Sequence, residues 1–345
     1  MQQDASIVTI DGIVPHPNAD RLELACVQGY RTAVPKGYVH AGDRVLYVQP
    51  DAKLSLDFKA QTWQTNYADY VSKSGRVKTI RLRGQYSNGF IVPLRSLPSV
   101  DLSSPSLCSL LGISHYELPV VGGSMGELTV RSKSLPAGIA PSDERNWQNL
   151  SDDEVAYGSE VLVTRKLDGT SCTVVCRPDG TYELCSHHMT LKPGHNKYME
   201  AVSPWLPKML GYAKDAADTV AFRGEVIGGG IQATRCNQDA RKPLGFFCYG
   251  IERPLAAGPA LRYGWYGTLG HFSVVCGSLS VPTVPLLGTA VLTREWCRKM
   301  IDAPASDGEG VVVNVPVSAL LLEGKIRSSC VDSFKLKSDD YYSKL

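Results

Sequence analysis

The stretch VLVTRKLDGTS, residues 161–171, decides the fold of the longer part of this chain. A β-branched run leads into Lys166, an Asp-Gly pair follows at 168–169, and a second β-branched run leaves through Ser171. Asp-Gly between two apolar runs is among the strongest short-range hairpin signals. The stretch therefore predicts a β-hairpin that presents Lys166 at the end of its first strand.

A lysine in that place, two residues from a carboxylate, has chemistry of its own. Once its amine has lost a proton, it can attack an electrophilic phosphorus and form a phosphoramidate. The reference pKa of lysine is about 10.4, so nearby cations or a metal would have to lower it. Taken alone, KLDG is better explained as a surface lysine before a common turn.

Short strands with turn signals between them extend outward on both sides. Before residue 100 we expect strands at 7–14, 23–27, 30–34, 44–48, 79–82 and 90–94, a pattern that suits a small closed barrel. From residue 160 we expect strands at 160–166, 171–177, 182–186, 219–227, 245–252, 310–315 and 332–336. Two helices are expected, 196–213, interrupted by its prolines, and 293–301, capped by Thr293.

Between these two groups of strands Ser, Pro and Gly accumulate and periodicity fades, which is typical of a linker. The fold class is therefore α+β: an N-terminal β-barrel followed by an antiparallel-sheet domain. The expected boundaries are 1–100 for the barrel, 101–141 for the linker and 142–345 for the second domain.

The amino-acid composition excludes several classes of protein. The 345 residues are 43% apolar and 20% charged with a formal net charge of +2, which indicates a globular protein and excludes a polycation. No apolar run reaches the roughly 18 residues of a membrane span and no secretory leader is visible, so we expect a soluble, intracellular protein of the cytoplasm or nucleus. The ten cysteines are scattered and expected to be reduced. Cys172 and Cys176 would lie about 13 Å apart on one strand, which disfavours a shared zinc.

Four further segments follow the KLDG stretch in order: FRGEVIGGG (222–230), GFFCYGI (245–251), DGEGVVV (307–313) and SFKLK (333–337). Each places a polar group at the end or along one side of an apolar strand. Such a set is consistent with one pocket that several strands line.

The order and content of these segments resemble the covalent nucleotidyltransferases, the superfamily of ATP-dependent DNA and RNA ligases and mRNA capping enzymes. The resemblance covers roughly residues 142–345. It implies a nucleotidyltransferase domain in which Lys166 takes AMP from ATP and passes it to a 5′-phosphate end. The AMP is lost when a 3′-hydroxyl attacks.

The resemblance also implies a role for each matched residue. Lys166 resembles the nucleophile, and Asp168, Glu225 and Glu309 resemble carboxylates that handle a metal, with Glu225 also near the ribose. The nucleotide contacts that it implies are Tyr249 on the adenine, Ser171 on the ribose, and Lys335 and Lys337 on the α-phosphate.

Elementary chemistry agrees with these roles. Lys335 and Lys337 are two apart on an expected strand, so both lie on one face, where their charge could neutralise a transferring phosphoryl group and help to deprotonate Lys166. Glu309 and Asp168 could hold Mg²⁺ or Mn²⁺ through water. Each has a simpler reading: a solvated strand face for the lysines, a core aromatic for Tyr249, and a cross-strand partner of Arg223 for Glu225.

One position departs from the family pattern. Where the family has an arginine shortly after the first motif, this chain has His187 in LCSHHM. A histidine has a shorter reach and is only partly charged near pH 7. Nucleotide or 5′-phosphate binding by His187 and a surface histidine pair are about equally supported.

The N-terminal barrel carries a second resemblance. IVPHPNADRLE (13–23) and LRGQYSNGF (82–90) resemble the OB-fold of tRNA-binding modules. An OB module ahead of a nucleotidyltransferase domain is similar to the Naegleria-type family of ATP-dependent RNA ligases. DERNWQ (143–148) matches that family before the first motif and implies that Arg145 helps to hold the phosphates. Only eight residues follow Lys337, too few for the C-terminal barrel that capping enzymes carry.

The barrel has its own signal for RNA. Five cations and no acid occupy residues 73–83, and the predicted contacts to RNA are Lys78, Arg81 and Arg83. Tyr30, Tyr47 and Tyr86 could stack on bases. A basic strand edge that guards against aggregation is the simpler alternative.

The sequence therefore predicts an ATP-dependent RNA ligase, a monomer, that joins 3′-OH and 5′-phosphate RNA ends with Mg²⁺ or Mn²⁺. Two alternatives stay open: a GTP-dependent mRNA capping guanylyltransferase, and an RNA-binding protein whose ligase domain has decayed.

Overall fold

The computed structural model describes residues 4–55, 65–116, 130–132, 134–141, 144–254, 261–264, 269–316, 321–322, 325–326 and 330–345. Contacts divide the chain into two compact units. The first comprises Met1–Pro119, Trp147–Asn149 and Asp339–Lys344, and the second comprises Val120–Asn146, Leu150–Ser338 and Leu345. No helix among the described residues is long and apolar enough to cross a membrane.

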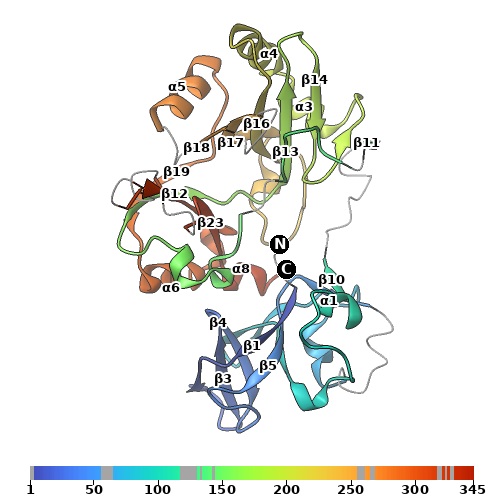
Figure 1. The fold of residues 1–345 in the computed structure, drawn as a ribbon, viewed down its shortest axis with the longest axis vertical. Helices are drawn as coiled ribbons and strands as arrows, with labels where there is room; N and C mark the ends of the chain where they lie inside the picture. The colour runs from blue at the N-terminus through green and yellow to red at the C-terminus, as the bar shows by residue number, and fades with distance from the viewer. Residues whose placement is uncertain are drawn as a thin grey trace. The chain divides into compact units, whose positions relative to one another are not determined.

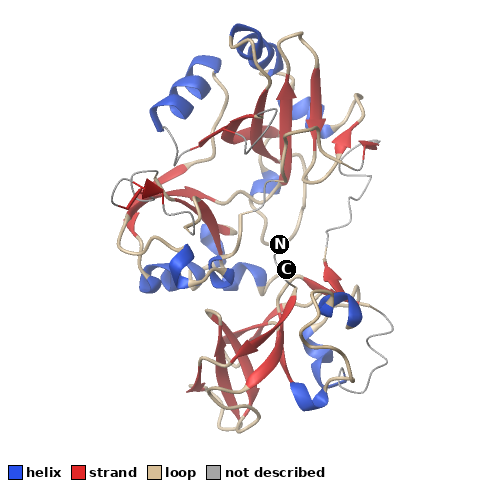
Figure 2. Cartoon of the chain, viewed as in Figure 1, coloured by secondary structure: helices blue, strands red, loops and turns tan. Residues whose placement is uncertain are grey.

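The first unit is a small antiparallel β structure (Figure 2). Two three-stranded sheets share one core, in which Val27, Val45 and Tyr47 are almost fully buried. The sheets are β1 (Ala5–Thr9), β5 (Arg44–Val48) and β9 (Phe90–Pro93), and β2 (Gly12–Pro15), β3 (Leu22–Val27) and β4 (Tyr30–Pro35). Two pairs complete the unit: β7 (Thr79–Leu82) with β8 (Gln85–Asn88), and β6 (Ala52–Leu54) with β10 (Ile113–His115).

The strand expected at 7–14 is divided into β1 and β2. The backbone N–H of Asp11 donates to Cys26 O at 2.9 Å, and its carboxylate accepts the N–H of Gln28 at 2.7 Å. These bonds end β1 and direct the chain into a second sheet. Residues 107–115 of the expected linker form α1 (Leu107–Leu110) and β10, because β10 pairs with β6 and Leu107 and Leu111 are buried in the same core. The linker residues 117–129 and 133 lie outside the described residues.

The end of the chain belongs to the first unit, although the sequence analysis assigned it to the second domain. Helix α8 (Asp339–Tyr342) packs beside β8. Tyr86 Oη donates to Asp340 at 2.7 Å, and Asn88 Nδ2 donates to Asp339 at 3.2 Å. These polar bonds and the burial of Tyr341, which is 1% exposed, explain the assignment of this short segment.

The second unit contains two antiparallel sheets. Figure 1 shows β13, β16 and β17 side by side in the larger one. Its order is β11 (Val130–Ser132), β15 (Thr190–Leu191), β14 (Tyr182–Cys185), β13 (Thr170–Cys176), β16 (Val220–Ile227), β17 (Gly245–Arg253) and β18 (Leu261–Gly264). The smaller one has the order β19 (Leu286–Val291), β12 (Glu160–Arg165), β20 (Gly310–Asn314) and β23 (Ser333–Lys337). β21 (Leu321–Leu322) and β22 (Lys325–Ile326) form a separate pair.

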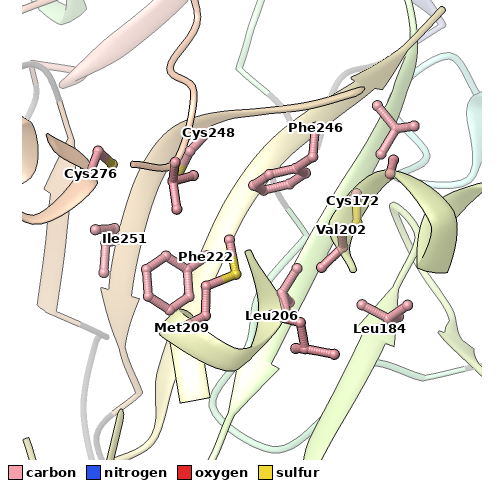
Figure 3. Close-up of a cluster of buried hydrophobic side chains, with 14 of the residues drawn as sticks. Cys172, Leu184, Val202, Leu206, Met209, Phe222, Phe246, Cys248, Ile251 and Cys276 are labelled. Carbon is pink, nitrogen blue, oxygen red and sulfur yellow. The ribbon is translucent and has the colours of Figure 1, made fainter. Parts of the chain in front are cut away.

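Helices cover one face of the larger sheet. They are α3 (Lys197–Val202), α4 (Leu206–Asp215) and α5 (Leu269–Leu279). Val202, Met209 and Cys276 from these helices share one buried cluster with Phe222 and Phe246 from the sheet (Figure 3). Because this layer is tightly packed, β13, β16 and β17 form a rigid support for the polar side chains that lie on the opposite face of the sheet.

Most expected elements are confirmed. The interruption of the helix at 196–213 falls between α3 and α4, where Pro204 stands. Helix α6 (Arg294–Ile301) begins as expected, with Thr293 Oγ1 accepting the N–H of Trp296 at 3.0 Å, and it packs against β20 and β23. Short 3₁₀ segments are Thr65–Tyr70, Leu94–Ser96, Trp147–Asn149, Asp152–Glu154, Asp239–Arg241 and Ala305–Asp307.

Candidate active site

Lys166 lies on a link between the two sheets of the second unit, and the predicted hairpin is wrong. β12 pairs with β19 and β20, whereas β13 pairs with β14 and β16. A Cβ added to Gly169 would lie 2.2 Å from Val226 O, so glycine is needed there because the backbone passes close to β16. The Asp-Gly signal therefore marks a close approach between backbones, and Lys166 is placed where the two sheets meet.

The Lys166 amine is bound to a carboxylate. Its Nζ donates to Glu309 Oε2 at 2.5 Å, and the two side chains are 22% and 7% exposed. Burial lowers the pKa of Lys166, but the carboxylates of Glu309, Glu225 and Asp168 together outweigh burial and raise the pKa above its ordinary value. The expectation that neighbouring lysines lower this pKa is therefore wrong for the protein alone, in which the amine is an ammonium.

Glu225 and Ser171 face one another on neighbouring strands. They are directly opposite in the β13–β16 register. Burial raises the pKa of Glu225 to about 8, and the negative charges of Glu309, Asp168 and Glu144 act in the same direction, while Lys166 opposes them. Asp168, Glu225 and Glu309 thus gather around one amine, as the sequence predicted.

Glu225 is not the partner of Arg223, which was its simpler reading. Arg223 Nη2 lies 2.7 Å from Glu252 Oε2 on β17, and both side chains are 4% exposed. Arg223 is thus paired with Glu252, and the Glu225 carboxylate belongs with Asp168 and Glu309 to the Lys166 cluster, the carboxylates around that amine.

The carboxylates suit a divalent metal of the magnesium type, since Mg²⁺ and Mn²⁺ prefer oxygen ligands. The raised pKa of Glu225 is caused chiefly by burial, and the neighbouring carboxylates add to it against the opposing charge of Lys166. Within the described ranges, no three His, Cys, Asp or Glu side chains converge as a direct ligand set. The chemistry of Asp168, Glu225 and Glu309, which is oxygen alone, fits a metal such as Mg²⁺ that is bound through a few carboxylates and keeps several waters.

The raised pKa of Glu225 gives the stability of the fold a pH dependence. An acid whose pKa rises on folding stabilises the fold below its ordinary pKa, and this contribution is lost as the pH rises through the folded pKa. For Glu225 the window runs from its ordinary 4.5 to about 8. We expect the melting temperature of metal-free protein to fall across this window, and to fall less steeply in Glu225→Gln. Thermal unfolding in a chelator at several pH values measures this, and equal slopes would contradict it.

Lys335 and Lys337 lie on β23 at alternate positions, opposite Val312 and Gly310 of β20. Alternate residues of a strand share a face, so the two lysines lie on one side as predicted. Lys335 is 9% exposed, which is incompatible with a solvated strand face.

Arg145 is joined to the same strand through its backbone, because Lys335 N–H donates to Arg145 O at 2.9 Å. Its guanidinium donates to both oxygens of Glu154, through Nη1 and, at 3.2 Å, through Nη2. These bonds lower the pKa of Glu154 to about 2. Arg145 is therefore near Lys335 along the backbone, while its side chain is held by Glu154.

Tyr249 sits at an irregularity in the sheet. Arg223 is opposite Gly250 and Gly224 is opposite Cys248, so Tyr249 is the extra residue of a β-bulge. Bulges redirect a side chain at functional sites. Tyr249 is partly buried against the core cluster, so both the adenine contact and the core reading are compatible with its place.

His187 lies in the connection between β14 and β15, with its ring centroid 3.9 Å from that of His188. β14 is separated from β16, which carries Glu225, by β13. His187 therefore forms a pair with His188. Its binding of the nucleotide or of the RNA 5′-phosphate stays a prediction.

In the first unit, Arg81 lies on β7, Arg83 lies in the turn after it, and Lys78 directly precedes the strand. Arg81 and Arg83 are exposed and Lys78 is half-buried. The Arg81 guanidinium stacks over Tyr86 at 5.4 Å. Arg83 has a φ of 43°, and Asn18 Nδ2 donates to its carbonyl at 3.0 Å, so the loop before β3 fixes this turn.

Two of the predicted stacking aromatics are core residues instead. Tyr47 is 0% and Tyr30 is 5% exposed, and their rings lie 5.3 Å apart. Tyr47 Oη donates to Asn88 O at 2.9 Å. Neither ring is accessible to a base, and the strand alternation was misjudged because both faces of β4 and β5 are largely buried.

Sequence reasoning missed Asp239, Asn237 and Gln232, which contact the backbone of the Lys166 link. They lie in an irregular segment after β16, where neither periodicity nor a motif marks them. Their nearest sequence signal is the GGG run at 228–230, which indicates a tight turn at the end of β16.

Comparison with known proteins agrees with this geometry. Residues 4–94 match a family described as an OB-fold domain, and residues 159–337, more than half of the chain, match the RNA ligase family. No curated protein matched the chain.

Solved structures of Naegleria gruberi RNA ligase are similar over nearly the whole chain. A lysine-to-alanine variant with ATP and Mn is 26% identical, with a TM-score of 0.77 and coverage of 99% of both chains. A glutamate-to-alanine variant with AMP and Mn is also 26% identical, with a TM-score of 0.78 and coverage of 100% of this chain and 99% of its own. The ligase with PPi is 26% identical, with a TM-score of 0.74 and coverage of 99% and 98%.

Proposed function

This chain belongs to the RNA ligase family, and from that membership we propose that it joins RNA 3′-OH and 5′-phosphate ends with ATP through a lysyl-AMP on Lys166. The observation that carries the proposal is the Lys166 amine, 2.5 Å from Glu309 and surrounded by the carboxylates Asp168 and Glu225. An isolated surface lysine would not be held in this way.

The first step forms one bond and breaks one. The Lys166 nitrogen, after giving its proton to the hydrogen-bonded Glu309 or to solvent, attacks the α-phosphorus of ATP. The N–P bond forms as the bond to the leaving pyrophosphate breaks. Lys335 and Lys337 neutralise the charge that develops on the α-phosphate.

Two further transfers complete the reaction. A 5′-phosphate oxygen of RNA attacks the AMP phosphorus and displaces Lys166, which yields an adenylylated RNA end. The 3′-hydroxyl of the other end then attacks that 5′-phosphate, and AMP leaves with the electrons of the broken bond.

The remaining residues bind and orient. Tyr249 is proposed to stack on the adenine, and Ser171 and Glu225 are proposed to contact the ribose. Arg145 is proposed to hold the phosphates once it gives up one of its two hydrogen bonds to Glu154. His187 is proposed to contact the ribose or the RNA 5′-phosphate. Asp168, Glu225 and Glu309 would hold Mg²⁺ or Mn²⁺, which supplies positive charge near the transferring phosphate. The presence of ATP or AMP with Mn in the similar Naegleria ligase structures supports this assignment.

End chemistry provides the direct test of ligation. With ATP and Mn²⁺, RNA bearing a 3′-hydroxyl and a 5′-phosphate should be sealed, with one AMP released per joint, and RNA bearing a 5′-hydroxyl should not react. Sealing of 5′-hydroxyl ends, or sealing without ATP by enzyme freed of bound AMP, would overturn the proposal. Nicked duplexes and single strands in the same assay identify the preferred substrate.

The first unit is proposed to bind RNA through the exposed Arg81 and Arg83 on β7 and its turn, with Lys78 on the same segment. Replacing both arginines by glutamate should weaken RNA binding. It should also reduce the slope of log affinity against log salt by roughly 0.7 for each lost contact with single-stranded RNA. Lysyl-AMP formation should change little. Arg95→Glu, an exposed reversal on another element, is the matched control. Equal loss of both activities would show a structural role instead.

A further inference from the structure

The link that carries Lys166 is held by side chains from a distant segment as well as by backbone hydrogen bonds. Because β12 and β13 belong to different sheets, residues 166–169 leave one ladder before they enter the next. Lys166 N–H still donates to Gly310 O at 3.0 Å. The backbone polar groups of Asp168 and Gly169 are buried best when they are hydrogen-bonded, which also limits the link to one conformation.

Side chains from residues 232–239 supply those partners. Asp239 Oδ2 accepts the N–H of Asp168 at 3.1 Å, and Asn237 Nδ2 donates to the Asp168 carbonyl at 3.1 Å. Gln232 Nε2 donates to the Gly169 carbonyl. Three side chains from one segment therefore bind the backbone two and three residues after Lys166.

Two of these three side chains are buried, and bonds within the segment hold them in place. Asp239 and Asn237 are 3% and 1% exposed. Asn237 Oδ1 accepts the N–H of Ala240 at 3.0 Å, and the turn at its base is closed by Gly230 N–H donating to Ala240 O at 2.9 Å. Buried, mutually bonded groups of this kind hold their geometry better than an exposed loop does.

Asp239 also reaches the residue before the nucleophile. Its Oδ1 accepts from Arg165 Nη2 at 3.1 Å and from Lys242 Nζ at 2.8 Å. The Arg165 guanidinium in turn lies against Gly308, where an added Cβ would be 3.4 Å from Nε and Nη2. Gly308 precedes Glu309, the partner of Lys166. Asp239 thus acts on both sides of Lys166 and, through Arg165, on the backbone beside Glu309.

We propose that Asp239, supported by Asn237 and Gln232, is a positioning residue that holds Lys166 in line for attack on the α-phosphate of ATP. The inference rests on the proposed function, since it assigns the attack to Lys166. Asp239 touches the link and not the reacting atoms. Its loss should slow the chemical step and leave ATP binding largely intact, because a displacement of about 1 Å can cost roughly 100-fold in rate.

Single-turnover formation of lysyl-AMP at varied ATP concentration tests this in the full-length protein. For Asp239→Asn we expect the maximal rate to fall about 100-fold, with little change in the ATP concentration at half-maximal rate. Gln238→Ala, an exposed neighbour without a cap hydrogen bond, is the matched control and should behave as wild type. Sealing of chemically pre-adenylylated RNA, which needs no attack by Lys166, should persist in Asp239→Asn.

Thermal unfolding of each variant separates positioning from loss of fold. If Asp239→Asn does not fold, Gln232→Ala tests the inference in its place. Its maximal rate should also fall, but by a smaller factor. A wild-type rate in the folded variant, or equal loss of pre-adenylylated sealing, would overturn the inference. Absence of label on the wild-type protein would instead overturn the proposed function.

Discussion

Replacement of Lys166 by alanine is expected to abolish covalent labelling of the protein by α-labelled ATP, with a loss of at least about 10⁴-fold, the scale on which removal of a covalent nucleophile acts. The label on wild-type protein should survive alkali and be released by hot acid, as expected of a phosphoramidate. It should also resist neutral hydroxylamine, which cleaves an acyl phosphate. Quantification of the labelled band after quenching with a chelator and detergent at alkaline pH measures the loss.

Two companion variants separate chemistry from folding. Lys166→Arg keeps a cation beside Glu309, but a guanidinium does not lose its proton in proteins, so it should fold and take no label. Lys192→Ala removes an exposed lysine of the same unit and should label normally. Label that persists in Lys166→Ala would place the nucleophile elsewhere and remove the assignment.

Removal of the Glu252 carboxylate is expected to lower the free energy of unfolding by about 3–5 kcal/mol, because it strands a buried guanidinium. Arg223 and Glu252 are each 4% exposed and 2.7 Å apart, and Arg223 Nη2 also donates to Ala140 O at 2.5 Å. Chemical denaturation of Glu252→Ala measures the cost. The signal that is followed should report unfolding of the second unit, because both residues belong to it. A two-unit protein need not unfold in one step.

The double replacement Arg223→Met/Glu252→Met provides the control. Exchanging a whole buried pair for apolar side chains of similar size is often nearly neutral, so the double variant should recover most of the stability that Glu252→Ala loses. It should also form lysyl-AMP, because neither residue has an assigned role in the reaction. A double variant as unstable as the single one would show that the pair itself stabilises the fold.

Local patterns predicted the strands well, because each segment had a strong period-two or β-branched signal. The bounds of β7 agree with the expectation, and those of β3, β9 and β13 differ by a single residue at one or both ends. β19 was missed, since LLGTAV has no alternation and its apolar residues Leu287 and Val291 are exposed. Helix α5 was missed for a related reason, as its sequence is apolar around most of its circumference and has no amphipathic period.

Pairing between strands was beyond local signals. Asp-Gly at 168–169 favours a hairpin, yet β12 and β13 join different sheets, because Gly169 is required by its approach to Val226 and not by a turn. The same limit applies to Asp239, whose contacts with Arg165 and Asp168 span more than 70 residues of chain. Contacts of that separation leave no periodic trace in one sequence.

The candidate site was recognisable because its residues stand on separate strands at motif positions. The structure brings Glu225 and Glu309 to Lys166, as expected. Its electrostatics were misjudged, since the lysine has carboxylates as its strongest neighbours and its pKa is raised. Under the proposed function, we therefore expect activation of the amine to need positive charge that offsets these carboxylates, such as a divalent cation.

Whether Lys166 is the nucleophile is decided by mass spectrometry and peptide mapping of the wild-type protein after incubation with ATP and Mn²⁺. We expect one added AMP, located on Lys166, formed from ATP but not from GTP, and absent when the metal is chelated. An unmodified Lys166 peptide, or AMP on any other side chain, would contradict it.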